Sequence, residues 1–160
     1  MSPWGAAIGG LTGTFVLTTI LRGASELRLT RIDLPFLLGT AVTTDRGRAK
    51  AIGYVLHFVA GLLFSMAYYV GFVVLDQSGW LLGAAFGLIH GLFAGSALVN
   101  ILLPIVHPRM GTSMSSIHST ALLEPPGFMM LNYGRSTPFV SLAAHVVFGA
   151  IVGAFTAAAS

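Results

Sequence analysis

Cysteine is absent from this chain of 160 residues, and charged residues make up only 8% of it. The lack of cysteine excludes disulfides, thiolate chemistry, cysteine-ligated zinc and iron–sulfur clusters. The lack of charge excludes an ordinary soluble domain, in which about 25% of residues are charged. Since 55% of the residues are hydrophobic, a soluble fold of this size has too little interior to bury them. The composition therefore predicts a single transmembrane domain, residues 1–160, with the lipid bilayer as its solvent.

Four apolar stretches are long enough, or nearly so, to cross a membrane as helices, which takes roughly 17–25 residues each. They cover about residues 4–21, 49–75, 80–103 and 138–158. Residues 76–79 form a polar turn between the second and third stretches, and Pro104 is expected to end the third. No Lys or Arg precedes the first stretch, so we expect it to be retained rather than cleaved as a signal peptide. The predicted fold class is all-α, a polytopic membrane four-helix bundle.

The basic residues predict how the helices are oriented. They fall in the loops after the first and third stretches: Arg22, Arg28, Arg31, Arg46, Arg48, Lys50, Arg109 and Arg135. Because cytoplasmic loops carry an excess of Lys and Arg, we expect both loops in the cytoplasm and both termini outside. This topology explains the formal net charge of +3, and no nucleic-acid partner is expected. Apolar pieces of these loops, at residues 32–39 and 126–131, predict interfacial segments lying against the bundle.

The two halves of the chain, residues 1–75 and 76–160, resemble each other. Gly5-Ala6-Ala7-Ile8-Gly9 matches Gly83-Ala84-Ala85-Phe86-Gly87, and His57-x-x-x-Gly61 matches His145-x-x-x-Gly149. Chance similarity between apolar helices is the alternative, but intramembrane histidine is rare. The pattern predicts two tandem two-helix repeats of equal orientation, related by an axis along the membrane normal. His57 and His145 would then lie at the same depth, about 10 Å inside the cytoplasmic boundary.

Glycines recur at four-residue spacing in the predicted spans, which is typical of a glycine zipper. The positions expected to pack helices together are Gly5, Gly9, Gly13, Gly61, Gly83, Gly87, Gly91, Gly95, Gly149 and Gly153. In lipid, helices associate through van der Waals contact, and small residues let their backbones approach closely. We therefore expect tightly packed helices, either within the chain or towards a second subunit.

The intramembrane histidines are the main candidates for function. His57, His90 and His145 lie inside apolar spans, and Asn100 is the other strongly polar residue there. Two facing imidazoles could ligate a haem iron, and three could bind a metal ion. A line of histidines could instead relay protons or hold a polar solute, although the spans contain no acidic residue to assist cation transport. The alternative is that each histidine hydrogen-bonds a neighbouring helix and binds no cofactor.

The loop after the third span offers weaker candidates. His107, Met110, Met114 and His118 combine imidazoles with thioethers, which would suit Cu(I). Glu124 is expected to pair with Arg109 or Arg135, and without a placed nucleophile or base it makes no catalytic constellation. No enzymatic activity is therefore expected.

Several strings together resemble a known but uncharacterised group, the small bacterial four-span membrane proteins of unknown function. The strings are Leu34-Pro35-Phe36-Leu37-Leu38-Gly39, His57-x-x-x-Gly61, His90-Gly91, His107-Pro108-Arg109-Met110 and Leu123-Glu124-Pro125-Pro126-Gly127. The resemblance covers nearly the whole chain and supplies no activity. It implies a bacterial cytoplasmic membrane.

Three functions follow from these patterns. The first is a non-enzymatic, tightly packed bundle that acts as a homo-oligomer or as a small subunit of a membrane assembly. The second is a transporter or channel for a small solute, with a polar path lined by histidines. The third is a haem- or metal-binding subunit that uses His57 and His145.

Overall fold

The computed structural model describes residues 1–110 and 123–159, and this part of the chain is helical without a β-strand. Four helical segments are long and apolar enough to cross a membrane: Pro3–Glu26, Arg46–Leu75, Trp80–Val106 and Thr137–Ala158. The predicted all-α class and the four candidate spans are confirmed. The first span continues beyond its predicted end at Leu21, because Arg22, Ala24 and Glu26 are good helix formers and extend α1 despite Gly23.

Short polar residues cap α1 and α3. Ser2 caps α1 (Pro3–Glu26), and its hydroxyl accepts a hydrogen bond from the Trp4 N–H at 3.3 Å. Asp45 caps α3 (Arg46–Leu75) by accepting from the Arg48 N–H at 2.7 Å. At the other end of α3, Asp76 adopts a left-handed conformation with φ 49°. These caps place the turn before α4 where the sequence predicted it.

The third span contains three kinds of helix. α4 (Trp80–Phe93) runs into a π-helix, η1 (Ala94–Leu102), which is followed by α5 (Leu103–Val106). The prediction that Pro104 ends this span is wrong: the proline lies in the first turn of α5, where no N–H is needed. The Asn100 amide donates to the Gly95 and Ser96 carbonyls, each at 2.8 Å, within this π-helix.

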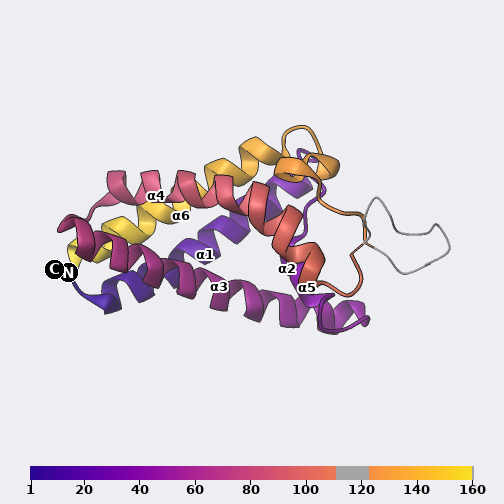
Figure 1. The fold of residues 1–160 in the computed structure, drawn as a ribbon, viewed down its shortest axis with the longest axis horizontal. Coiled ribbons are helices and arrows are strands. Elements are labelled where there is room, and N and C mark those ends of the chain that lie inside the picture. The colour runs from indigo at the N-terminus through magenta and orange to yellow at the C-terminus, as the bar shows by residue number, and fades with distance from the viewer. Residues whose placement is uncertain (111–122, 160) are drawn as a thin grey trace.

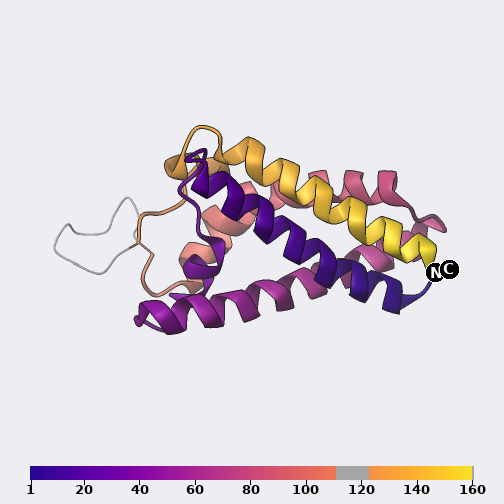
Figure 2. The same cartoon turned by 180° about the vertical axis from the view of Figure 1, so that it is seen from behind.

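Helix α6 (Thr137–Ala158) lies between α1 and α4 and packs against both (Figures 1 and 2). On the α4 side, a Cβ on Gly83 would overlap the carbonyl oxygen of Gly149. On the α1 side, a Cβ on Gly5 would lie 2.6 Å from the Phe155 carbonyl oxygen. Glycine at these positions therefore allows backbone-to-backbone contact that no larger residue permits.

Helix α3 packs against its neighbours in a different way from α6. It contacts α1 where Gly10 faces Ser65 and Gly61 faces Thr14, and it carries the short α2 helix (Leu34–Gly39) on its first turns. Towards α4 it presents aromatic side chains: Phe72 stacks on Phe86 with ring centroids 5.1 Å apart. The α3–α4 contact is thus wider than the glycine-mediated α1–α6 contact, and the packing of the two halves is not an exact twofold.

The two long loops meet at one end of the molecule. The Arg31 N–H donates to the Tyr133 carbonyl at 2.7 Å, and the Arg31 guanidinium pairs with Glu124 at 3.4 Å. The buried hydroxyls of Thr30 and Thr137 are 2.7 Å apart. The predicted pairing of Glu124 with Arg109 or Arg135 is therefore wrong, because the first loop folds over the η2 segment (Phe128–Tyr133) and brings Arg31 to it.

Both termini lie together at the opposite end (Figure 1). The outward faces of the long helices are apolar: Val74 of α3, Leu81 of α4 and Phe139 of α6 are each at least 68% exposed. A surface of this kind belongs against lipid acyl chains rather than water.

Candidate functional site

Three histidines from three helices lie together: His57 of α3, His90 of α4 and His145 of α6. The rings of His90 and His145 meet edge to face with centroids 4.8 Å apart. All three line one cavity of about 100 Å³. The structure thus gathers residues that the sequence placed in separate spans, and we call them the histidine cluster.

Two of the three histidines have hydrogen-bond partners. His90 Nδ1 shares a hydrogen bond with the Tyr68 hydroxyl at 3.1 Å, and its ring stacks on Phe64 with centroids 3.8 Å apart. His145 Nδ1 lies 2.7 Å from the Ser141 carbonyl oxygen. Because a carbonyl only accepts, His145 carries a proton on Nδ1, which makes Nε2 the acceptor of the neutral ring.

His57 differs from the other two. It is 8% exposed, and its Nε2 is a buried polar atom without a hydrogen-bond partner among the described residues. Leaving a buried imidazole nitrogen unpaired costs free energy of folding. Without a partner, this atom does not join helices through a hydrogen bond. It is instead free to donate to or accept from a small molecule, depending on the tautomer.

The inner cavity around the cluster is largely apolar. Leu17, Phe64, Val99 and Phe148 contribute to its walls. Its described lining residues include no carboxylate and no Lys or Arg. A charged molecule would lose its hydration here without compensation, so the cavity suits a neutral one.

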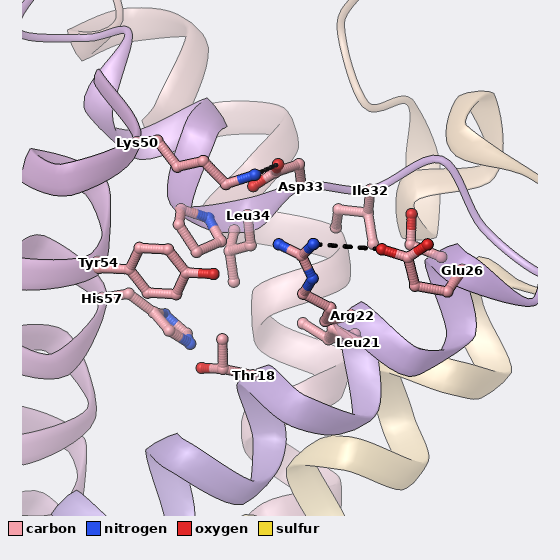
Figure 3. A pocket seen from close by; sticks show the side chains of 12 residues that line it. Thr18, Leu21, Arg22, Glu26, Ile32, Asp33, Leu34, Lys50, Tyr54 and His57 are labelled. Atoms are coloured by element: carbon pink, nitrogen blue, oxygen red, sulfur yellow. Dashed lines mark hydrogen bonds and ion pairs between the residues drawn. The ribbon is translucent and has the colours of Figure 1, made fainter. Parts of the chain in front are cut away.

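A second cavity, of about 120 Å³, lies between the inner cavity and the charged end, and we call it the vestibule. Figure 3 shows its polar side chains: Lys50 pairs with Asp33 at 3.2 Å, and Arg22 pairs with Glu26 at 3.2 Å. The Tyr54 hydroxyl points towards Arg22 in the same view. The vestibule therefore has a charged rim.

His57 connects the two cavities. It lines both, together with Leu21, Ile32 and Leu34. In Figure 3 its ring lies below Tyr54 and near Thr18, at the inner end of the vestibule. The two cavities are therefore adjacent, with His57 in the wall that they share and His90 and His145 on the inner side.

Aromatic rings close the route towards the termini. Tyr68, Phe72, Phe86 and Phe148 pack on one another with centroid distances of 5.1–6.5 Å. Phe72 and Phe148 are at most 1% exposed. The route is therefore open at the charged end and blocked at the other.

The other predicted site residues lie elsewhere. Asn100 bonds to its own helix and does not line either cavity. His107 is buried, with Nε2 3.0 Å from the Leu37 carbonyl oxygen and Nδ1 accepting from the Arg109 N–H at 3.2 Å. Both of its nitrogens are therefore engaged: Nε2 ties α2 to the end of the third span, and Nδ1 holds the local turn to Arg109. Met110 is buried nearby, whereas Met114 and His118 lie outside the described residues. The hypothesis that these four residues bind copper therefore stays untested.

Neither haem nor a metal ion fits the histidine cluster as it stands. A cavity of about 100 Å³ is far below the roughly 300–1,000 Å³ of pockets for larger organic ligands, and a porphyrin needs at least that. Within residues 1–110 and 123–159, no three His, Asp or Glu side chains are grouped to hold a metal ion. The geometry therefore favours a small uncharged molecule.

Sequence reasoning missed the vestibule. From the sequence, Arg22 and Lys50 serve only to predict the topology, and neither Asp33 nor Tyr54 is singled out. The Asp33 side chain accepts from the Phe36 N–H at 3.0 Å and caps α2, which then lies on α3 beside Lys50. The available signal was an N-cap residue followed by Pro35, which marks a helix start in the middle of a loop.

No protein-family model, curated protein or solved structure matches this chain. The resemblance to small bacterial four-span proteins stays a prediction.

Proposed function

We propose that this chain is a non-enzymatic multi-pass protein of a bacterial cytoplasmic membrane that binds a small neutral solute at the histidine cluster and lets it cross the bilayer. The observation that carries the proposal is His57, which lines both the vestibule and the inner cavity and whose buried Nε2 has no hydrogen-bond partner within residues 1–110 and 123–159. A solute with one hydrogen-bonding group would satisfy that atom.

The size of the cavities limits the solute. An apolar cavity of about 150 Å³ accommodates benzene, so a cavity of about 100 Å³ takes a molecule smaller than that. Small amides and alcohols meet the conditions of size, polarity and zero charge. Passage would require the aromatic closure at Tyr68 and Phe148 to open, as in an alternating-access cycle.

The topology in this proposal has the charged end in the cytoplasm. The basic residues near the vestibule support it, since cytoplasmic loops carry an excess of Lys and Arg. The two halves, residues 1–75 and 76–160, would be tandem repeats packed as a four-helix bundle, and equivalent histidines at residues 57 and 145 in one cavity support this.

Assembly into an oligomer remains a separate proposal with less support. The glycine faces that suggested it are used within the chain, because Gly9 and Gly13 pack on α6 and Gly87 packs beside His145. Gel filtration in mild detergent tests it, and a strictly monomeric species without a co-purifying subunit counts against it.

Solute uptake into proteoliposomes tests the main proposal. The purified chain is reconstituted and challenged with a panel of small amides and alcohols, with uptake followed by stopped-flow light scattering. We expect faster uptake of at least one solute than into empty vesicles, and a loss of about tenfold or more in His57→Leu.

Leu63→Phe is the matched control, because Leu63 is on the same helix and is 66% exposed on its outer face. It should retain the wild-type rate. Equal uptake by wild-type, His57→Leu and empty vesicles across the panel would overturn the proposal.

A further inference from the structure

A long groove runs along the outer side of α1 and α3, distinct from the histidine cluster. It consists of two adjoining hollows of about 350 and 360 Å³ that share Tyr54 and Phe58. Its apolar part is lined by Leu11, Phe15, Val55, Phe58, Val59 and Leu62. In Figure 2, α1 diverges from α3 towards the charged end.

The groove has one cation, at one end. Arg22 lines the hollow nearest the charged end, together with Thr18, Thr19 and Tyr54. Space is available beside it, since a Cβ on Gly23 would have no other atom within 4 Å. Arg22 pairs with Glu26, but its side chain is 56% exposed, and a guanidinium has five N–H donors to share.

The length of the groove matches one leaflet of a bilayer. From Leu11 to Arg22 the α1 helix rises about 16 Å, at ~1.5 Å per residue. Half of the hydrocarbon core of a typical bilayer is about 15 Å. An acyl chain lying along the groove would therefore begin at Arg22 and end near Leu11, with its headgroup at the charged end.

We propose that this groove binds an anionic membrane phospholipid, with its phosphate on Arg22 and one acyl chain between α1 and α3. The apolar walls fit the chain, and the single guanidinium fits the phosphate, which Arg binds in bidentate fashion. The lipid is preferred over a second copy of this protein because the groove ends in a cation, and Glu26 is already paired with it.

Lipid retention measured by native mass spectrometry tests the proposal. The purified chain is equilibrated with phosphatidylglycerol or with phosphatidylcholine of the same acyl chains. We expect wild type to retain phosphatidylglycerol preferentially, and Arg22→Gln to bind it about fivefold more weakly, as expected for the loss of one basic residue near a membrane surface. Arg48→Gln removes an exposed arginine outside the groove and should bind like wild type.

A second variant and a competition experiment complete the test. Val59→Trp fills the apolar part of the groove and should lower retention of both lipids without touching Arg22. Inorganic phosphate should not displace the lipid, because it lacks the acyl chain. Equal retention of the two lipids by wild type, equal affinities of Arg22→Gln and Arg48→Gln, or a protein dimer abolished by Val59→Trp would each overturn the proposal. The readout is binding, so it is independent of solute flux.

Discussion

His57 and His107 are both buried histidines, and they differ in what their nitrogens contact. His107 uses both nitrogens on neighbouring backbone groups, whereas His57 Nε2 has no hydrogen-bond partner in the described chain. An unpaired buried polar atom lowers stability, and such atoms persist at functional sites. The contrast separates a histidine that holds the fold together from one that is available to a ligand.

Replacing each histidine by leucine should therefore have opposite effects. His57→Leu should leave the free energy of unfolding unchanged or raise it by up to about 1 kcal/mol, because it removes an unsatisfied group. His107→Leu should lower it by about 1–3 kcal/mol, because the Arg109 N–H loses its acceptor and the Leu37 carbonyl loses one of its two side-chain contacts. Thermal unfolding in detergent measures both. An equal loss in the two variants would mean that His57 has a structural partner after all.

The pKa of Tyr133 predicts that the stability of the charged end depends on pH. Burial, with a smaller contribution from Glu124, raises the pKa of Tyr133 to about 12, and its hydroxyl donates to the Glu124 carbonyl at 2.8 Å. Because the folded pKa lies above the unfolded value of about 10, the stabilisation is fully present below pH 10. It is lost as the pH rises through about 12.

Thermal unfolding of wild type and Tyr133→Phe between pH 9 and 12 tests this dependence, which is expected from the direction of the shift. Wild type should lose stability over this range, and the Phe variant should lose less because it has no proton to release. Parallel pH profiles would contradict the assignment to Tyr133.

At the scale of helices, hydrophobic runs and charge predicted where the spans lie, and local chemistry decided where they end. The α3–α4 turn was predictable because Asp76 and Gly79 are turn residues. The π-helix was not, because Ala94–Leu102 reads as an ordinary apolar helix. The wider turn is evident only in the three-dimensional backbone of this segment, where the Asn100 amide bonds two carbonyls.

The same distinction applies to the candidate site. The matching positions of His57 and His145 were visible in the repeat pattern, since depth follows from residue count along a helix. Their convergence with His90 depends on how α4 and α6 pack, which the glycine spacing does not specify. The vestibule depends on α2 folding back onto α3, a tertiary contact without a periodic signal.

The α4–α6 contact gives a direct test of the glycine packing. Gly83→Ala should lower the free energy of unfolding by about 1–3 kcal/mol, because its Cβ would overlap the Gly149 carbonyl and force the helices apart. Gly23→Ala is the matched control: it lies in α1 with no atom within 4 Å of the new Cβ, and it should raise stability by about 0.4–1 kcal/mol. Similar unfolding temperatures for the two variants would show that α4 and α6 do not meet closely.

Considered as a whole, the molecule is polar at one end and nearly uncharged along its length. The vestibule opens at the end that carries the ion pairs of Arg22, Arg31 and Lys50, and both termini lie at the other end. The direction in which the site faces therefore depends on which end is cytoplasmic. The basic residues near the spans favour a cytoplasmic location for the charged end.

The absence of cysteine makes this orientation directly measurable, because each introduced thiol is the only one in the chain. Gln77→Cys places a thiol in the α3–α4 turn, and Thr44→Cys places one in the loop before α3, both at exposed positions. On intact cells a membrane-impermeant maleimide should label Gln77→Cys, and Thr44→Cys should react only after permeabilisation. The reverse pattern would put the vestibule outside the cell, and solute would then enter the histidine cluster from the exterior.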